Sequence, residues 1–579
     1  MNVISFGSHS IMIQRDGCVS LQLLLSPVSF YNPSPMPTHR IRARRPDAST
    51  KTPVELITAT DQLATFLEDA AHFPGGHTPA VVFPRDEAQL ASVLQGAAAV
   101  LPVGAQSSLT GGATPRGEVV LSLSKLTVIA EPAQTHITAQ AGVTLTSLRN
   151  MLTDAGKAYP PVPTFEGATI GGIVSTNAAG AATFKYGTTR DWVRGLSVML
   201  ACGELLDLER GQVRAADGRF AVEMSRGTIT VPVPTYRMPD VPKHSAGYHA
   251  APDMDLIDLF IGSEGTLGIV TSVTLDILPH RPGICLILVA LDDEARALRV
   301  ATRLRDASVE TRRASARNGL DVVAIEHMDR RCLELLREEG ADRRTRVTVP
   351  DTAGVVLLAQ VELPPGTTAA QVHQEVGLAA TADAPDTPIV RLCRLLDAEG
   401  LLETTELAAP GDRTRTAELL AFREAVPDAV NRRVGIAKRT VDDTIEKTAA
   451  DMIVPYPRFA DSLSLFRDAF GTRGLDYAIW GHLSDANLHP NLLPRTADEV
   501  RLGQDAILAC GREIIRWGGC PLAEHGVGRN RTKQALLWQL YGDTGIEQMR
   551  AVKRALDPLG TLSPGVLFPV RPDTGREKP

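Results

Sequence analysis

Four segments crowded with glycine and other small residues lie between residues 102 and 270 of this 579-residue chain. They read PVGAQSSLTGG (102–112), PTFEGATIGGIVSTNAAG (163–180), FKYGTTRDWVRG (184–195) and IGSEGTLGIV (261–270). Glycine permits turns at positive φ and brings bare N–H groups against a ligand, so such segments can cradle a pyrophosphate without lysines. Tight turns alone explain one such segment, whereas four in one region predict a nucleotide-binding surface.

The common phosphate-binding fingerprints are absent from the sequence. It contains no G-x-x-x-x-G-K-[ST] and no G-x-G-x-x-G between a strand and a helix, so neither a P-loop nor a Rossmann site is predicted. The G-x-S-x-G elbow of the α/β-hydrolases is absent as well. A nucleotide bound to this chain must therefore be held by another fold.

The hydrophobic pattern changes along the chain. Residues 58–126 alternate helical patterns with short apolar runs, which predicts an α/β unit. A second unit follows, with a strand at 136–142 and a helix at 144–156 whose leucines share one face. Beyond residue 281, apolar strands such as VVLLAQVEL (355–363) are separated by helical pieces rich in Arg and Glu. This change predicts a second domain of the α+β class.

Residues 544–556 close the chain with a predicted helix. Thr544 and Glu547 have the spacing of a capping box. The apolar face of this helix is predicted to consist of Ile546, Met549, Val552 and Leu556.

Composition restricts the partners and the compartment. The net charge of −7 gives no basic field for nucleic acid, so we expect no nucleic-acid partner. The seven cysteines are scattered singly, which argues against a disulfide framework, an iron–sulfur cluster or a zinc knuckle and favours a reducing compartment. The apolar run at 18–25 is far too short for a membrane helix. We expect a cytoplasmic protein, with peripheral association with the membrane as the alternative.

Two histidines flank a short polar run in LDYAIWGHLSDANLHPNLL (475–493). A hairpin with the four-residue loop 484–487 would place His482 and His489 directly opposite each other, with Cβ atoms about 5 Å apart. Two imidazoles at this spacing can share one ion at about 2 Å each. A lone histidine on a hairpin is usually structural, but Glu524 in AEHGVG (523–528) offers a third ligand. Two histidines and a carboxylate suit zinc, manganese or ferrous iron.

Seven motifs in a fixed order resemble one family. They are LTGGA, EGATIGGIVSTNAAG, KYGTTRDWVRGL, GSEGTLGIVT, GHLSDANLHPNLL, AEHGVG and ALDPLGTLSPG, and they extend from about residue 55 to 568. The set resembles the flavin-dependent D-lactate dehydrogenase and glycolate oxidase group of the vanillyl-alcohol oxidase superfamily.

The resemblance implies an α+β fold with a PCMH-type FAD-binding domain of two subdomains and an α+β cap domain with an antiparallel sheet. The FAD-binding domain would span 46–280, with subdomains 46–126 and 127–280. The cap, or substrate, domain would span 281–520, and residues 521–579 would return to the flavin. Residues 1–45 are expected to form a poorly ordered extension, with Met36 as a candidate start.

The resemblance also implies which residues bind FAD. They are Pro102, Gly104, Ala105, Gln106, Ser107, Ser108, Thr110, Gly111, Gly112, Pro163, Glu166, Gly167, Ala168, Thr169, Gly171, Gly172, Ser175, Thr176, Asn177, Gly180, Tyr186, Gly187, Glu264, Gly265, Gly268 and Ile269. The family's triple glycine is replaced by residues 104–108, GAQSS, which predicts a differently shaped cradle. Segment 102–112 contains no histidine or cysteine, so we expect non-covalent FAD.

The implied activity is oxidation of a D-2-hydroxy acid, similar to D-lactate or glycolate, to the 2-oxo acid. His482, His489 and Glu524 match the family's divalent metal ligands (Zn, Mn or Fe), and His525 matches its base. Arg423 matches a substrate-binding arginine, and Lys447 and Asn491 are further candidates for substrate binding. Expected partners are a small 2-hydroxy acid, an electron acceptor (a quinone, a cytochrome, an electron-transfer flavoprotein or oxygen) and a second copy of the chain.

Two alternatives remain from the sequence. A metallohydrolase would use His482, His489 and Glu524 with an activated water, but it leaves the glycine-rich segments unexplained. A non-catalytic flavin-binding subunit of a larger oxidase is the other alternative, and the retained histidines argue against it.

Overall fold

The computed structural model describes residues 4–6, 9–11, 38–47, 53–161 and 165–570. The chain divides into two compact units, residues 1–36 and 37–579. In the first, β1 (Ile4–Phe6) and β2 (His9–Ile11) pair antiparallel. Most of the extension predicted at residues 1–45 lies outside the described residues, and the rest of the fold concerns the second unit.

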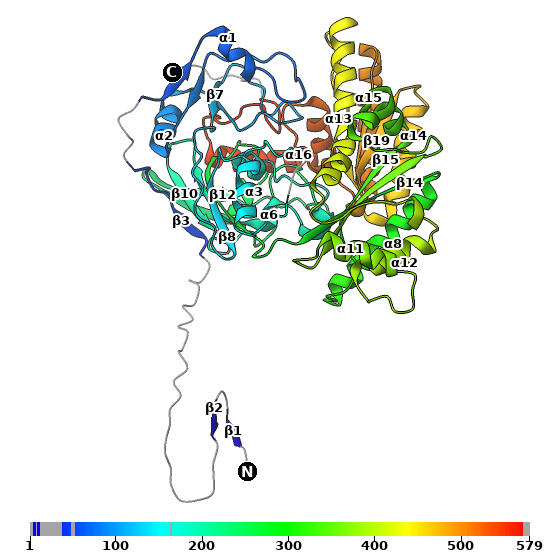
Figure 1. Ribbon diagram of the computed structural model, residues 1–579. Helices are drawn as coiled ribbons and strands as arrows, with labels where there is room; N and C mark the ends of the chain where they lie inside the picture. Colours follow the sequence, from blue (N-terminus) through cyan, green and yellow to red (C-terminus); the bar gives the residue numbers. More distant parts are fainter. Residues whose placement is uncertain (1–3, 7–8, 12–37, 48–52, 162–164, 571–579) are drawn as a thin grey trace, which may run out of the picture. The chain divides into compact units, whose positions relative to one another are not determined.

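A four-stranded sheet in the order β4-β5-β7-β6 lies in the first part of the second unit. Figure 1 labels its strand β7 and the nearby helices α1 and α2. Its elements are β4 (Glu55–Ile57), α1 (Thr60–Leu63), the 3-10 turn η1 (Ala64–Phe66), β5 (Val81–Phe83), α2 (Glu87–Gly96), β6 (Val100–Val103) and β7 (Val119–Ser122). The strands β5, β7 and β6 are parallel, which confirms the α/β pattern of residues 58–126. The parallel arrangement follows from α2, which carries the chain from β5 to β6.

A second, antiparallel sheet in the order β10-β9-β13-β8 follows. Its strands are β8 (His136–Gln140), β9 (Val193–Met199), β10 (Leu205–Glu209) and β13 (Ile269–Asp276). The helices of this region are α3 (Leu145–Asp154), α4 (Ile170–Ser175), α5 (Thr183–Tyr186), α6 (Thr189–Trp192) and α7 (Ile257–Phe260). The predicted apolar face of α3 is confirmed, because Leu145, Leu148 and Leu152 are buried.

A small third sheet corrects the start of the folded chain. It consists of β3 (Arg40–Arg42), β11 (Arg219–Met224) and β12 (Gly227–Pro232), with β3 parallel to β11. The extension predicted at residues 1–45 includes β3. As an edge strand, β3 leaves both of its arginines exposed and contributes backbone hydrogen bonds instead of an apolar face.

The cap region contains a seven-stranded antiparallel sheet in the order β17-β14-β16-β15-β19-β20-β18. Its strands are β14 (Gly283–Leu291), β15 (Asp321–Asp329), β16 (Val355–Leu363), β17 (Glu406–Ala408), β18 (Met452–Ile453), β19 (Tyr477–His482) and β20 (Asn487–Leu492). The predicted antiparallel sheet is therefore confirmed. The chain enters it near residue 281, between the end of β13 and the start of β14.

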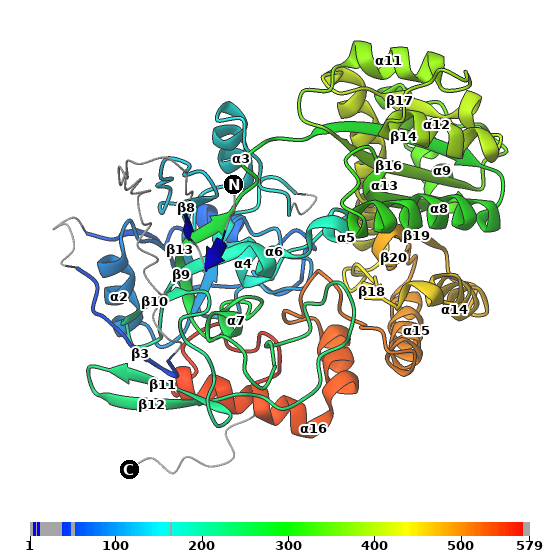
Figure 2. The ribbon, with the colours of Figure 1, turned by 90° about the horizontal axis from the view of Figure 1, so that it is seen from below.

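Helices cover both faces of this sheet (Figure 2). They are α8 (Glu294–Arg313), α9 (Arg330–Glu338), α10 (Ala341–Thr345), α11 (Ala369–Leu378), α12 (Pro388–Ala398), α13 (Arg413–Thr440), α14 (Phe459–Gly471) and α15 (Ala497–Arg516), with 3-10 turns η2 (Leu402–Thr404), η3 (Tyr456–Arg458) and η4 (Leu483–Asp485). Ile287 and Val289 pack in the cluster of α8 and α12, whereas Leu286 and Leu288 pack in that of α9 and α13. Burial of both faces explains the continuous apolar runs of these strands.

The last helix, α16 (Arg531–Leu556), returns the chain to the first half of the unit. It lies against β12 and α15 (Figure 2). Its predicted apolar residues Ile546, Met549, Val552 and Leu556 are all buried. The range Arg531–Leu556 joins two helices across a kink at Gly542 (φ +64°), so the second of them begins close to the predicted start at Thr544. Beyond α16, Val100 of β6 donates a backbone hydrogen bond to Thr561, so the C-terminal segment reaches the first sheet.

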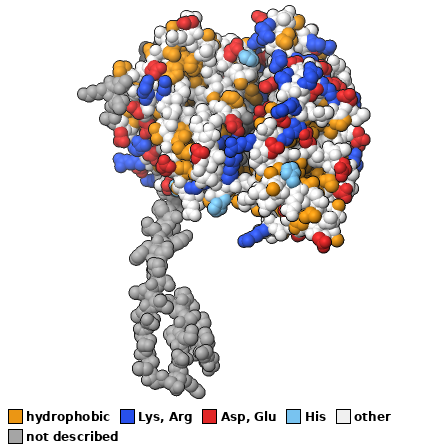
Figure 3. All heavy atoms as spheres, in the orientation of Figure 1, with side chains coloured by type: hydrophobic (Ala, Val, Ile, Leu, Met, Phe, Trp, Pro, Cys, Tyr) orange, Lys and Arg blue, Asp and Glu red, His pale blue; other side chains and the backbone are white. Residues whose placement is uncertain are grey.

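The described surface carries both signs of charge. On the face drawn in Figure 3, Lys and Arg side chains lie among Asp and Glu side chains. Within the described residues, the structure contains no helix long and apolar enough to span a membrane.

Candidate active site

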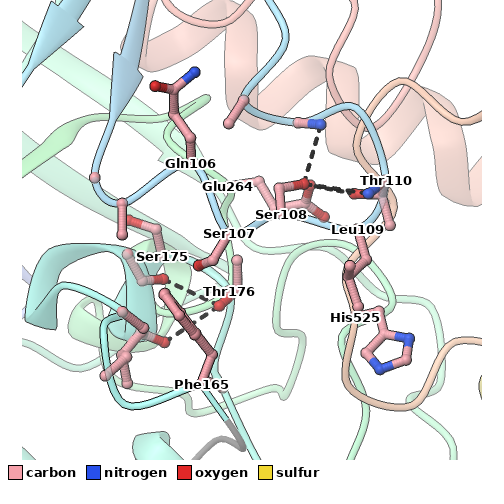
Figure 4. A pocket seen from close by; sticks show the side chains of 18 of the residues that line it. Gln106, Ser107, Ser108, Leu109, Thr110, Phe165, Ser175, Thr176, Glu264 and His525 are labelled. Atoms are coloured by element: carbon pink, nitrogen blue, oxygen red, sulfur yellow. Dashed lines mark hydrogen bonds between the residues drawn. The ribbon is translucent and has the colours of Figure 1, made fainter. Parts of the chain in front are cut away.

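A cavity of about 390 Å³ joins the glycine-rich segments to the histidine motifs. Its walls come from residues 102–113, 165–179 and 264–270 on one side and from 423–449 and 480–533 on the other. In Figure 4, Ser107, Ser175 and Thr176 lie on one side of the pocket and His525 lies on the other. The size is typical of a small-molecule site.

Most of the predicted FAD-binding residues line this cavity. Those that do are Pro102, Gly104, Ala105, Gln106, Ser107, Ser108, Thr110, Gly112, Ala168, Thr169, Gly171, Gly172, Ser175, Thr176, Glu264, Gly265, Gly268 and Ile269. Pro163 lies outside the described residues. The predicted residues that do not line the cavity are Gly111, Glu166, Gly167, Asn177, Gly180, Tyr186 and Gly187.

The residues that do not line the cavity form contacts within the fold instead. The N–H of Gly111 donates to Asp69 at 2.6 Å, and Asn177 Oδ1 accepts the N–H of Arg190 at 2.9 Å. Glu166 forms an ion pair with Arg149 on the surface. Within these motifs, some residues therefore line the cavity and others contact the surrounding fold, and the assignment of the latter to FAD stays a prediction.

The segment 184–187 contacts the seven-stranded sheet. Tyr186 Oη donates to Glu362 of β16, and Lys185 Nζ lies 2.7 Å from Asp321 and 2.6 Å from Glu362. The carbonyl of Phe184 accepts a hydrogen bond from Arg312 at 2.9 Å. This segment therefore ties the glycine-rich half of the unit to the seven-stranded sheet.

Backbone forms much of the cavity wall on the glycine-rich side. A Cβ on Gly104 would lie 2.1 Å from Thr169 Oγ1, so two of the glycine-rich segments meet there without room for a side chain. A Cβ added to Gly528, which has φ +56°, would overlap Thr110 in a similar way. A wall of exposed backbone is what a nucleotide cradle requires, so the residues present fit FAD.

The residue that replaces a family glycine at position 106 retains a glycine-like backbone. Gln106 has φ +52°, in the left-handed region that disfavours side chains. Its side-chain amide donates to the carbonyl of Glu68 at 3.2 Å. The segment around Gln106 therefore keeps its turn, although the left-handed backbone of Gln106 is strained.

Three imidazoles converge on one carboxylate oxygen at the other end of the cavity. The Nε2 atoms of His482, His489 and His525 lie 3.3, 3.1 and 3.6 Å from Oε1 of Glu524. Ligands at about 2.0–2.2 Å from one ion are separated by about 3–3.5 Å in tetrahedral or octahedral geometry. The donor set therefore suits a divalent cation. Ligand atoms of Asp451, His489, Glu524 and His525 lie within 4.8 Å of one another, so the assignment of His482 together with His489 and Glu524 as the ligands stays a prediction.

The register of the histidine hairpin differs from the prediction. His482 pairs with Asn487 and His489 pairs with Trp480, so the two histidines are diagonal neighbours, not a directly opposed pair. The loop is 483–486, formed by η4 and a left-handed Ala486 (φ +64°), which turn-residue preferences do not indicate. The pairing is shifted by two residues, which preserves the face, and the two rings still lie 5.1 Å apart.

Glu326, in the middle of β15, orients His482. Its Oε2 atom lies 3.1 Å from His482 Nδ1 and accepts a hydrogen bond from Arg423 at 3.2 Å. Burial raises the pKa of this carboxyl, but Arg423 and His482 together lower it to about 2. An ionised Glu326 directs Nε2 of His482 toward Glu524.

Lys243 is fully buried beside the cluster. Its Nζ lies 3.0 Å from both Asp485 Oδ2 and Glu524 Oε2. Burial lowers the pKa of Lys243, but the two carboxylates outweigh it and the net shift is upward. The ammonium group of Lys243 fixes one carboxylate oxygen of Glu524, and the other oxygen faces the imidazoles.

His525 lines the cavity and is neutral at pH 7. Burial lowers the pKa of His525 to about 3, against the opposing effect of Asp451. Its ring stacks on that of His489, with centroids 4.9 Å apart. A neutral imidazole facing the cavity is able to accept a proton.

The predicted substrate-binding residues Arg423, Lys447 and Asn491 all line the cavity. Lys447 donates to Asn431 at 2.8 Å, and burial together with Lys533 lowers the pKa of Lys447 to about 8. Asn491 donates to the carbonyl of His489, while its Oδ1 is buried without a hydrogen-bond partner among the described residues. An acceptor in this state is suited to a hydroxyl-bearing ligand.

Several charged residues of the site were not predicted from the sequence. They are Lys243, Glu326, Asp451, Asp485 and Lys533. Glu326 interrupts the apolar strand VVAIEHMD, and a charge inside a strand is the signal that could have identified it. Lys243, Asp451 and Asp485 lie in loops or short strands without such a pattern, so their roles depend on tertiary contacts.

Comparison with known proteins gives two family matches. The model described as an FAD binding domain matches residues 78–209, and the model described as FAD linked oxidases, C-terminal domain, matches residues 292–567. A D-2-hydroxyglutarate dehydrogenase of Xanthomonas citri is 29% identical over 82% of this chain and 84% of its own. The glycolate oxidase subunit GlcD of Bacillus subtilis is 28% identical, with 84% and 88% coverage. A D-lactate dehydrogenase of Anaerostipes hadrus is 26% identical, with 80% and 83% coverage.

Solved structures agree in fold. p-Cresol methylhydroxylase superposes with a TM-score of 0.61 at 15% identity, over 90% of this chain and 95% of that one. Alkyldihydroxyacetonephosphate synthase gives a TM-score of 0.54 at 14% identity, over 93% and 90%. Together with the glycine-lined cavity and the two family matches, these likenesses show that the chain belongs to the FAD-linked oxidases, with a PCMH-type FAD-binding domain followed by the C-terminal domain of that family.

Proposed function

We propose that the chain is an FAD-dependent dehydrogenase that oxidises a D-2-hydroxy acid to the 2-oxo acid. The observation that carries the proposal is the single cavity that the glycine-rich segments share with the His489, Glu524 and His525 cluster and with Arg423 and Lys447. The names of the relatives, which include D-2-hydroxyglutarate dehydrogenase, D-lactate dehydrogenase and glycolate oxidase, support this substrate class and its D configuration.

We assign the two ends of the cavity to two ligands. FAD would bind non-covalently within residues 46–280, along the segments at 102–112, 165–179 and 264–270. The acid would bind within the cap residues 281–520, and the segment 521–579 would supply Glu524 and His525.

The substrate carboxylate would be held by cations. Arg423 donates one described hydrogen bond to Glu326, and a guanidinium has five N–H donors, so further donors are available for a bidentate contact. Lys447 lines the same end of the cavity, as does Lys533. The acceptor Oδ1 of Asn491 would take a hydrogen bond from the acid.

The proton and the hydride of the substrate have separate destinations. His482, His489 and Glu524 would hold a divalent cation, which lowers the pKa of a bound hydroxyl. His525 accepts the hydroxyl proton at Nε2, because its imidazole is neutral and faces the cavity. Bound FAD supplies the acceptor for the Cα hydride. Electrons then leave to a quinone, a cytochrome, an electron-transfer flavoprotein or oxygen.

Anaerobic spectroscopy of the purified protein tests the proposal. We expect a yellow protein whose flavin absorbance is bleached by a D-2-hydroxy acid, faster than by the L enantiomer, and more slowly after treatment with a chelator. Denaturation should release all of the flavin. A colourless protein that hydrolyses esters would support the metallohydrolase, and a yellow protein that no 2-hydroxy acid bleaches would support the non-catalytic subunit.

A further inference from the structure

The loop that carries Glu524 and His525 is held by side chains. Its five consecutive N–H groups at 524–528 all donate to side-chain oxygens from three distant segments of the chain. Asp451 accepts the first two at 2.8 Å each, Ser245 accepts the third at 2.9 Å, and Glu264 accepts the last two at 2.8 Å each. The loop is therefore positioned by these three acceptors and not by a helix or a sheet.

Asp451 differs from the other two acceptors because it also faces the imidazoles. Its Oδ1 lies 3.4 Å from His489 Nδ1, and its Oδ2 lies 3.5 Å from His525 Nδ1. These distances exceed the ideal length of about 2.9 Å for an N–H···O bond, so the attraction is mainly electrostatic. With the Nδ1 edges of both rings toward Asp451, the Nε2 edges face Oε1 of Glu524.

The position of Asp451 argues against a role as a metal ligand, although its carboxylate lies within ligand distance of the cluster. Oδ2 already accepts two backbone N–H groups, and Oδ1 accepts the side-chain amide of Asn487 at 3.1 Å. Three of the roughly four lone-pair sites of a carboxylate are thus occupied. Asp451 also lies on the Nδ1 side of the rings, whereas the Nε2 atoms converge on Glu524.

We propose that Asp451 is a positioning residue for the reaction: it fixes the backbone of Glu524 and His525, and it keeps the proton of His489 and His525 on Nδ1 so that both Nε2 atoms are available. This proposal rests on the proposed function, which assigns His489 as a metal ligand and His525 as the base. Carboxylates that orient imidazoles in this way contribute about 10–100-fold to metal affinity or activity.

Asp451→Asn in the FAD-loaded protein tests the proposal. We expect the amide oxygen to take the place of Oδ2, where two backbone N–H groups require an acceptor. The NH2 group then faces His489 Nδ1 and drives the proton of that ring to Nε2. Titration with Mn²⁺, followed by electron paramagnetic resonance, should give a dissociation constant about 10–100-fold higher than that of the wild type, with an unchanged FAD content.

Ser245→Ala is the matched control. It removes one acceptor from the same loop, at Gly526, but its hydroxyl has no described contact with an imidazole. Its Mn²⁺ dissociation constant should change by less than about threefold, well below the 10–100-fold range. An equal loss of Mn²⁺ affinity in the two variants would mean that only the position of the loop affects binding. This result would overturn the proposal that Asp451 orients the imidazole rings.

A second measurement does not depend on whether the Asp451→Asn variant folds. ¹⁵N NMR of the wild-type protein, labelled at histidine and loaded with Zn²⁺, should show Nδ1-protonated rings for His489 and His525, assigned with single His→Gln variants. Rings without a proton on Nδ1 would overturn the proposal, as would wild-type Mn²⁺ affinity in Asp451→Asn. Loss of all detectable Mn²⁺ binding in that variant would instead make Asp451 a ligand. These readouts need no substrate, so failure of the wild type to oxidise any 2-hydroxy acid would refute the proposed function alone.

Discussion

The two ends of the cavity are built in opposite ways. The glycine-rich end is largely backbone, and its segments meet where a side chain would not fit, as at Gly104 and Thr169. The histidine end is made of buried charges from separate elements, with Glu326 on β15, Lys243 in a loop and Asp451 beside β18. Close backbone packing stabilises the glycine-rich end, and pairing of opposite charges stabilises the histidine end. Substitutions at the two ends should therefore impair different properties of the protein.

The largest effect is expected from Lys243→Met. It would leave Asp485 and Glu524 without their shared cation in a fully buried position, and breaking a buried ion pair from one side costs about 3–5 kcal/mol. Urea unfolding of the FAD-loaded protein should measure this loss. Lys185→Met, at a partly exposed ammonium that also pairs with two carboxylates, should lose less. Equal losses in the free energy of unfolding would show that burial does not make the ion pairs of the histidine end more important for stability.

Glu524→Gln should separate the proposed metal site from the flavin site. The amide would be a weaker ligand for a divalent cation and loses the ion pair with Lys243, so turnover should fall by about a hundredfold or more. The FAD-to-protein ratio, measured from absorbance, should stay at the wild-type value. A parallel loss of flavin would contradict the separation of the two ends.

Gly104→Ala is the complementary test at the glycine-rich end. The new Cβ would overlap Thr169 Oγ1 and push two cradle segments apart, at a cost of about 1–3 kcal/mol. FAD affinity should fall by a corresponding factor in equilibrium dialysis, while Mn²⁺ affinity should be retained. Unchanged FAD affinity would show that this contact lies outside the cradle.

Arg423→Lys tests one of the cations that line the cavity. Lysine keeps a positive charge beside Glu326 but loses the fork that binds a carboxylate at two points. The KM of the acid should rise by about tenfold, which corresponds to about 1.4 kcal/mol. An unchanged KM would remove Arg423 from the substrate site.

The smallest effect is expected from Gln106→Gly. Relief of the left-handed backbone would stabilise the fold, but glycine is more flexible in the unfolded state and the hydrogen bond to Glu68 is lost. The net change in the free energy of unfolding should be below about 1 kcal/mol. A larger change, measured by urea unfolding, would mean that GAQSS sets the shape of the cradle.

The contrast between the two ends also explains what the sequence could predict. Short motifs carry their own turns, so the cavity wall at 102–112 and 264–270 was predicted from local residue patterns, and so was the buried leucine face of α3. Other residues of these motifs, such as Asn177 and Tyr186, are polar side chains that contact the surrounding fold and do not line the cavity. The local residue pattern alone does not distinguish residues that line the cavity from residues that contact the surrounding fold.

The charged support of the histidine end depends on contacts between distant segments. Asp451 lies far along the chain from the loop at 523–528 that it holds, and nothing in its neighbours AAD and MIV indicates that role. The hairpin register failed for a related reason, because a left-handed Ala486 is unfavourable in isolation and is stabilised by its buried surroundings. Such features are fixed by tertiary packing, which a single sequence does not display.

The contacts of segment 184–187 have a consequence for how substrate and product exchange. Lys185 pairs with Asp321 and Glu362, and Tyr186 binds the same Glu362, so a hinge motion between the two sheets would expose several charges together. We therefore expect the FAD-binding half and the cap sheet to move as one rigid body during turnover. The ligand of the proposed reaction would then reach the histidines through local rearrangement of the side chains that line the cavity, without separation of the two halves.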